Sequence, residues 1–158
     1  MSKKRPARKR AGRGRAARKP KRRLAATAAA KPVPKPSLYE RLGGVYAIAA
    51  VVDDFVDRLM KDPRLNANPK VDEAHHRVPP AGFKYLVTEQ VCWATGGPQK
   101  YTGKNMKDAH KGLGVTDADF AALVASLKTA LDKNKVGEKE QKELFDLLGP
   151  MRKDVVEK

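Results

Sequence analysis

The chain has 158 residues, enough for one compact domain, and its 34 basic residues against 18 acidic ones give a formal net charge of +16. A single cysteine, Cys92, excludes an intrachain disulfide and a cysteine-rich zinc site. No apolar run approaches the length of a membrane span, so we expect none.

The positive charge is concentrated at the N-terminus. Residues 1–37 hold fifteen of the 34 basic residues and no Asp or Glu, which leaves 19 basic and 18 acidic residues for 38–158. Because residues 1–37 have almost no apolar bulk to offset the entropy of ordering, we expect a disordered Lys/Arg/Ala/Pro-rich arm there. The remainder, 38–158, is a nearly neutral domain.

Three functions suit this basic arm. Fifteen cations would neutralise phosphates and release counterions, which predicts salt-dependent binding to DNA, RNA or another polyanion. Arginine-rich, acid-free N-termini are also typical of organelle targeting segments. The third interpretation is a solubilising arm with no fixed partner. We expect a cytoplasmic location, with nucleoid association if the arm binds DNA and with organelle targeting left open.

The domain begins with two helices. Ser37 and Glu40 have the spacing of a capping box, which predicts a short helix ended by Gly43 and Gly44. From Val45 the apolar residues recur with a helical period, and this second helix should end near Asp62-Pro63 because proline disfavours helix in the residue before it. Its apolar stripe is Ile48, Val51, Val52, Phe55 and Leu59.

The segment 66–80 is rich in Asn and Pro, and we expect a loop there with at most one helical turn. It contains the adjacent pair His75 and His76. Neighbouring residues on a turn point in different directions, and no Cys or third His is close in sequence. A surface pair is therefore the favoured interpretation over a metal site.

Three further long helices follow. Pro80 begins one that Thr95 ends, Thr116 caps another together with Asp119, and the last starts near Glu138 and should kink or end at Gly149-Pro150. Their apolar stripes are Phe83, Leu86, Val87 and Val91; Phe120, Leu123, Val124, Leu127 and Leu131; and Leu144, Phe145, Leu147, Leu148 and Met151. No strand pattern is present, so the predicted fold class is all-α.

A short helix at 106–110 carries the most distinctive chemistry. Met106 and His110 are four residues apart and so share one helix face, and glycines at 103, 112 and 114 bracket the segment. A neutral imidazole held in this way suits an axial haem-iron ligand, and the Met106 thioether could lie against the porphyrin. On these residues alone, a hydrogen-bonded structural histidine is the commoner alternative.

The order and spacing of these motifs resemble the group 1 truncated haemoglobins. The residues that carry the resemblance span 38 to about 155, essentially the whole domain, and leave out the basic arm. They are Leu38–Gly44, Val51–Phe55, Asp62–Leu65, Gly96–Gly103 and Met106–Thr116. The resemblance implies a two-over-two helical sandwich.

The resemblance also implies a haem b cofactor and a set of site residues. His110 would be the proximal iron ligand, Met106 and Leu123 would touch the ring, and Tyr101 would reach a propionate. The distal side would be lined by Phe55, Val56, Phe83, Leu86 and Val87. Oxygen, nitric oxide or carbon monoxide would bind the iron, and we expect a monomer.

The sequence departs from the family on the distal side. Family members that hold oxygen tightly present a Tyr on the second helix and Gln on the third, whereas Val56, Phe83 and Val87 occupy these positions here. Without a donor the pocket should release oxygen quickly. Gln90 could supply one, or the extra residues before the third helix could bring His76 or His75 over the iron, with His76 slightly favoured.

Three functional hypotheses follow. The leading one is a haem globin that reversibly binds oxygen or nitric oxide at an iron held by His110. The second is a nucleic-acid-associated protein that uses residues 1–37, with the haem domain as a gas or redox sensor. The third, an enzyme, is a nitric oxide dioxygenase, and the apolar distal residues argue against it.

Overall fold

The computed structural model describes residues 32–158, and residues 1–31 of the predicted basic arm lie outside it. From 32 to 158 the chain contains helices and no strand, which confirms the all-α prediction. The helices are α1 (Leu38–Arg41), α2 (Gly44–Lys61), α3 (Pro63–Asn66), α4 (Pro69–Arg77), α5 (Pro80–Ala94), α6 (Met106–His110), α7 (Asp117–Lys133), α8 (Glu138–Leu148), the 3₁₀-helix η1 (Gly149–Met151) and α9 (Arg152–Val155).

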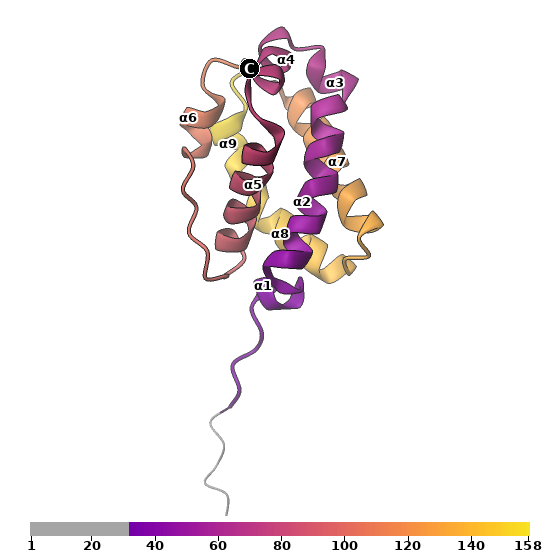
Figure 1. The fold of residues 1–158 in the computed structure, drawn as a ribbon, viewed down its shortest axis with the longest axis vertical. Helices are drawn as coiled ribbons and strands as arrows, with labels where there is room; N and C mark the ends of the chain where they lie inside the picture. Colours follow the sequence, from indigo (N-terminus) through magenta and orange to yellow (C-terminus); the bar gives the residue numbers. More distant parts are fainter. Residues whose placement is uncertain (1–31) are drawn as a thin grey trace, which may run out of the picture. The chain divides into compact units, whose positions relative to one another are not determined.

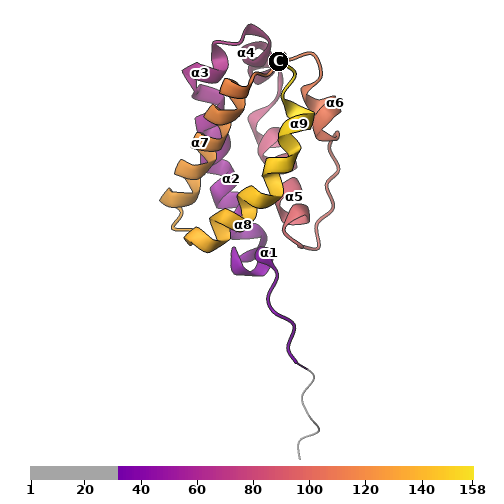
Figure 2. The same ribbon diagram turned by 180° about the vertical axis from the view of Figure 1, so that it is seen from behind.

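Two pairs of long helices form a two-layer sandwich within the compact unit Lys35–Lys158. Helices α2 and α5 lie side by side toward the viewer in Figure 1, and α7 and α8 cover them from the other side in Figure 2. Helix α2 packs against both α5 and α7. No helix within 32–158 combines the length and apolar character needed to cross a membrane.

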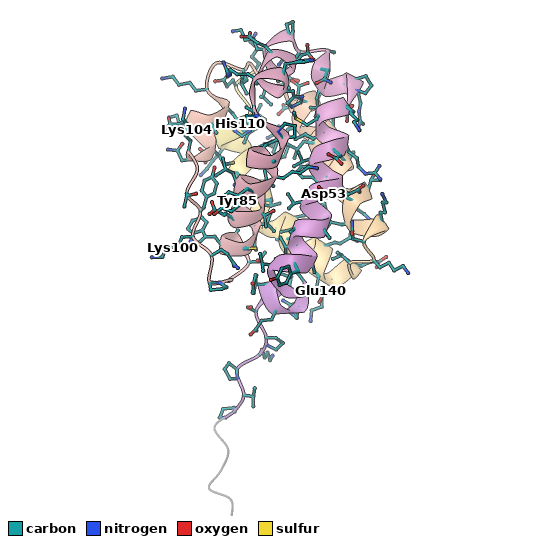
Figure 3. All side chains as sticks on the ribbon, in the orientation of Figure 1. Asp53, Tyr85, Lys100, Lys104, His110 and Glu140 are labelled. Carbon is teal, nitrogen blue, oxygen red and sulfur yellow. The ribbon has the colours of Figure 1, made fainter. Side chains whose placement is uncertain are left out.

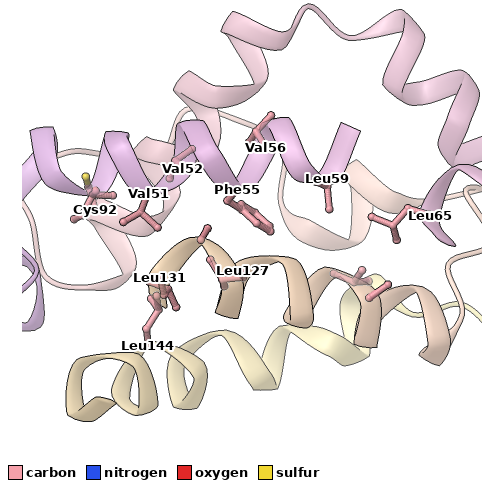
Figure 4. Close-up of a cluster of buried hydrophobic side chains, with 14 of the residues drawn as sticks. Val51, Val52, Phe55, Val56, Leu59, Leu65, Cys92, Leu127, Leu131 and Leu144 are labelled. Carbon is pink, nitrogen blue, oxygen red and sulfur yellow. The ribbon is translucent and has the colours of Figure 1, made fainter. Parts of the chain in front are cut away.

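The core lies between the two layers. In Figure 4, Phe55 of α2 points toward Leu127 of α7, and Leu131 lies next to Leu144 of α8. All four side chains are buried. The apolar stripe predicted for the second helix is therefore the stripe that packs against α7, because residues three and four apart share one face of a helix.

Local signals set most of the helix ends as predicted. The Ser37–Glu40 capping box is present, and so is the one formed by Thr116 and Asp119 at the start of α7. Gly43 ends the first turn with φ of 97°, a conformation that favours glycine because it has no Cβ. Helix α8 ends at Leu148, and η1 over Gly149–Met151 links it to α9.

The prediction of a loop over 66–80 was wrong, because a helix, α4, occupies Pro69–Arg77. Asn68 caps it by accepting a hydrogen bond from the Lys70 amide, and Pro69 takes the first helical position, where its missing N–H costs nothing. Asp62 and Pro63 start the unpredicted helix α3 in the same way. These prolines begin helices, whereas the sequence interpretation treated them only as breakers.

Asn68 also fastens the start of α4 to a distant part of the chain. Its Nδ2 donates to the Leu113 carbonyl at 3.0 Å and lies 3.3 Å from the Gly114 carbonyl. Both acceptors lie in the turn that follows α6. One side chain therefore caps α4 and holds it beside the segment after His110.

A buried carboxylate fixes the segment that leads into α6. Glu89 of α5 is only 7% exposed. Its Oε2 accepts hydrogen bonds from the Thr102 amide at 3.1 Å and the Thr102 hydroxyl at 2.6 Å. The hydroxyl bonds from Thr102 and from Tyr85 lower the pKa of Glu89 from its ordinary value of 4.5. Glu89 thus stabilises this segment in its ionised form.

We predict that Asn68→Ala lowers the free energy of unfolding by about 1–2 kcal/mol, since it removes a helix cap and the bonds to Leu113 and Gly114. Asn68→Ser keeps a cap acceptor but is too short to reach Leu113, so it should recover only the cap contribution. Urea unfolding followed by circular dichroism measures both losses. A serine variant as stable as wild type would show that the bonds to the Leu113 segment contribute nothing.

Glu89→Gln should destabilise the protein at neutral pH, and the difference from wild type should shrink as the pH falls below about 4.5. A carboxylate whose pKa is lowered by folding contributes stability above its unfolded pKa and loses that contribution as acid protonates it in the folded state. Thermal unfolding of both proteins across this pH range measures the effect. A difference that stays constant with pH would mean that the charge of Glu89 is not what holds Thr102.

Candidate functional site

A large apolar cavity lies within the helical unit. Its volume is about 1120 Å³, slightly above the about 300–1,000 Å³ of ordinary small-molecule sites. Helices α2, α5, α6, α7 and α8 all contribute to its wall, mainly with aliphatic and aromatic side chains. The polar side chains of the lining are few: His75, Arg77, Gln90, Tyr101, Thr102, Lys104, His110 and Asp119.

His110 lines this cavity at the end of α6 (Figure 3). Its Nδ1 lies 2.8 Å from the backbone carbonyl oxygen of Met106. A carbonyl oxygen can only accept a hydrogen bond, so Nδ1 carries the proton and donates it. The other ring nitrogen, Nε2, is then unprotonated and has a lone pair available for a metal or a proton.

The chain on both sides of His110 is fastened. Asn105 caps α6 by accepting a hydrogen bond from the Asp108 amide at 2.8 Å. After the helix, the Glu157 carboxylate accepts hydrogen bonds from the amides of Gly112 at 2.7 Å and Gly114 at 2.6 Å. These two bonds also lower the pKa of Glu157. The C-terminal end of the chain therefore helps to hold the imidazole in place.

The structure brings most of the predicted site residues to this one cavity. Met106 lies one turn before His110, and Leu123 of α7 is also part of the wall. Tyr101 lines it too, and its hydroxyl donates to the Lys104 carbonyl at 2.6 Å. From α2 and α5 the wall includes Phe55, Phe83, Leu86 and Val87.

Two residues expected at the site lie elsewhere. Val56 is completely buried but is not part of the cavity wall. It follows Phe55 by one residue, which turns its side chain about 100° around α2, and in Figure 4 it points away from the side that Phe55 occupies. His76 is also absent from the wall: its side chain is 79% exposed, and its Nδ1 lies 2.8 Å from the Asp72 carbonyl.

His75, in contrast, does line the cavity. Its Nδ1 lies 2.8 Å from Oδ1 of Asn66. Burial lowers the pKa of His75 from its ordinary value; the charge of Asp72 opposes this shift, and His76 adds to it. The sequence interpretation favoured His76 slightly, and the structure places His75 at the cavity because the unpredicted helix α4 turns the two rings to different sides.

Gln90 is the one polar side chain that α2 and α5 contribute to the wall. Its amide nitrogen lies 3.1 Å from Sδ of Met106 and 3.6 Å from Sδ of Met151. A thioether sulfur is a weak acceptor, so these bonds hold the amide loosely. The amide is directed at the α6 side of the cavity, where His110 also lies.

Several residues that build the site were not identified from sequence. Arg77 and Lys104 bring positive charge to the wall, and Glu89, Asn66 and Glu157 hold its parts in place. Arg77 directly follows the histidine pair, and Lys104 directly precedes the cap of α6. Their positions beside recognised motifs could have indicated that they belong to the site. The partners of the three others come from distant or unpredicted elements.

The cavity fits a haem group. Haem needs a large apolar slot, one imidazole lone pair on the iron and cations or donors near its propionates. The wall offers the apolar side chains, the Nε2 of His110, and Arg77, Lys104 and Tyr101. Within residues 32–158, no group of three or more His, Cys, Asp or Glu side chains is placed to hold a metal ion by itself.

The chain is similar in sequence to known globins. The model of the family described as bacterial-like globin matches residues 37–157. A group 1 truncated haemoglobin of Tetrahymena pyriformis is 30% identical over 122 residues, which cover 77% of this chain and 96% of that protein. One of Synechocystis is 34% identical over 107 residues, which cover 65% of this chain and 81% of that one.

Solved structures agree with these relatives. The ferric truncated haemoglobin of Tetrahymena pyriformis has a TM-score of 0.66 and 28% identity, with 78% of this chain and 100% of that one covered. The cyanomet 2/2 haemoglobin of Synechococcus, with covalently attached haem, has a TM-score of 0.64 and 27% identity, covering 77% and 98%. Haem b is the typical cofactor of the family. The chain therefore belongs to the bacterial-like globins and, within them, to the group 1 truncated haemoglobins.

Proposed function

We propose that this globin holds haem b in the apolar cavity through His110 and reversibly binds a diatomic gas, oxygen or nitric oxide, at the iron. The observation that carries the proposal is the hydrogen bond from His110 Nδ1 to the Met106 carbonyl at 2.8 Å. It leaves Nε2 with a lone pair inside a cavity large enough for the cofactor. Bound haem would supply an iron with a position for gas opposite His110.

The cavity wall determines how the gas would be held. Oxygen bound to haem iron carries negative charge and is stabilised by a hydrogen-bond donor, and the wall from α2 and α5 offers only Gln90. Phe83 and Val87, at the positions where the family resemblance puts polar donors, are apolar. We therefore expect fast oxygen release. Nitric oxide dioxygenation is the weaker alternative, because it needs oxygen to stay bound until nitric oxide arrives.

Replacing His110 by glycine should remove the axial imidazole and leave a space of the same shape. The absorption spectrum of the haem-loaded His110→Gly protein should lose the features of histidine ligation, and added free imidazole should restore the wild-type spectrum. His76→Gly is the matched control, since His76 lies outside the cavity wall, and its spectrum should stay unchanged. A His110→Gly spectrum identical to wild type without imidazole would refute the assignment.

A second function is favoured by the charge of residues 1–37. Fifteen cations without a single acid suit a nucleic acid, whereas the rest of the chain is nearly neutral. We propose that this arm binds DNA or RNA without sequence preference. It would attach the haem domain to a nucleic acid, as a gas or redox sensor would require.

Full-length protein should bind a random DNA duplex with an affinity that falls steeply with salt, since each neutralised phosphate releases a counterion. A variant without residues 1–34 keeps the compact unit Lys35–Lys158 and should lose this binding. Fluorescence anisotropy between 50 mM and 200 mM salt measures both proteins. Equal affinity in the truncated protein would refute a role for the arm, and absence of binding by the full chain would favour a targeting or solubilising segment.

A further inference from the structure

Helix α5 presents two aromatic rings to solvent that have no part in the haem cavity. The side chain of Tyr85 belongs to a residue that is 62% exposed, and Trp93, the only tryptophan of the chain, is 57% exposed. Glu89 lies four residues from each of them, so all three residues lie along one side of the helix. Tyrosine and tryptophan are the side chains most often used to contact a partner, because they combine a large apolar ring with a polar group.

The ring of Tyr85 is held in place from below. Its hydroxyl is hydrogen-bonded to the Glu89 carboxylate. Glu89 is buried and accepts bonds from the Thr102 amide at 3.1 Å and the Thr102 hydroxyl at 2.6 Å. A ring anchored in this way has little freedom left to lose when another flat ring stacks on it.

The segment after α5 adds positive charge to the same side of the molecule. Because Thr102 is bonded to Glu89, this segment runs back along α5 toward α6. Figure 3 shows Tyr85, Lys100 and Lys104 on one side of the molecule. We call this surface the lysine–aromatic face. It comprises Tyr85, Trp93, Lys100, Lys104, Lys107 and Lys111, all of them exposed.

The lysines of this face lack acidic partners. None of the four forms an ion pair with another residue of 32–158. The acids between 85 and 111 are Glu89, which is buried, and Asp108, which accepts a hydrogen bond from Asn105 at 2.9 Å. The rest of 38–158 holds 15 basic and 16 acidic residues, so the positive balance of the domain comes from this face.

Exposed rings beside cations suit a single strand of nucleic acid. Lysines attract its phosphates, and every base has a flat face that can stack on an aromatic ring. In a duplex the bases are already stacked on one another. Residues 1–37 have fifteen cations and no aromatic residue, so they can contact phosphates but cannot stack bases. The face supplies what the arm lacks, which favours nucleic acid over an acidic protein as the partner.

We propose that the lysine–aromatic face binds single-stranded DNA or RNA, with bases stacked on Tyr85 and Trp93 and phosphates beside the lysines. This inference rests on the proposed binding of nucleic acid by residues 1–37, which would bring the strand to the domain. The arm by itself does not distinguish a strand from a duplex. The face gives the whole protein a preference for single strands.

The test uses full-length, haem-loaded protein and filter binding of three probes: oligodeoxythymidine, oligouridine and a random duplex with the same number of phosphates. Tighter binding of either strand than of the duplex supports the proposal and identifies the strand as DNA or RNA. Trp93→Leu should weaken strand binding about fivefold or more and leave duplex binding unchanged. Tyr46→Leu is the matched control, since Tyr46 is 90% exposed but belongs to α2, and it should change neither.

Tyr85 allows stacking to be separated from its structural bond to Glu89. Tyr85→Phe and Tyr85→Leu both remove that bond, but only the leucine variant removes the ring. Tyr85→Phe should therefore keep most of the affinity for the strand, whereas Tyr85→Leu should lose about fivefold or more. Circular dichroism confirms that each variant keeps its helices.

The lysines are tested through salt dependence. Lys100→Gln combined with Lys107→Gln should reduce the slope of log affinity for the strand against log salt by about 1.4, from about 0.7 for each phosphate contact. Lys135→Gln combined with Lys139→Gln removes the same charge at the start of α8, in the opposite layer, and should leave the slope unchanged.

The outcomes separate this inference from the function on which it rests. Duplex binding as tight as strand binding, unchanged strand binding in Trp93→Leu and Tyr85→Leu, or an equal loss in Tyr46→Leu would overturn the role of the face and leave binding by the arm intact. Absence of binding to all three probes would defeat both, and the face would then suit an acidic protein instead.

Discussion

The proposed haem binding depends on the hydrogen bond between His110 Nδ1 and the Met106 carbonyl. It joins two residues of one short helix, so it depends on α6 being formed and correctly capped. Asn105 starts that helix and Glu157 holds the glycine turn behind it. A helix of five residues has little stability of its own. The surrounding tertiary contacts therefore give the imidazole its fixed tautomer and direction.

The hydrogen-bond arrangement at Nδ1 of His110 recurs on α4 at Nδ1 of His75. The amide of Asn66 does for His75 what a backbone carbonyl does for His110, and Asn68 ties α4 to the turn after His110. The cavity wall is mainly apolar, which favours a flat hydrophobic cofactor.

Sequence patterns predicted the long helices well, because their apolar residues recur with a helical period and their caps are local. The two-over-two fold and the position of His110 followed from motif order. The prediction for 66–80 failed because Pro69 was taken as part of a loop although it begins α4, whereas Pro80 begins α5 as predicted. That error also hid the difference between His75 and His76. Contacts such as Glu89 with Thr102 had no sequence signal, because they depend on how distant segments pack.

The most direct test is a crystal structure of the ferric protein loaded with haem b. The iron should be bonded to Nε2 of His110, whose Nδ1 should remain within hydrogen-bond distance of the Met106 carbonyl. Haem lying in the cavity between α5 and α6 with His110 as ligand would establish the central claim. Iron bonded to another residue in place of His110, or haem bound outside the cavity, would contradict it.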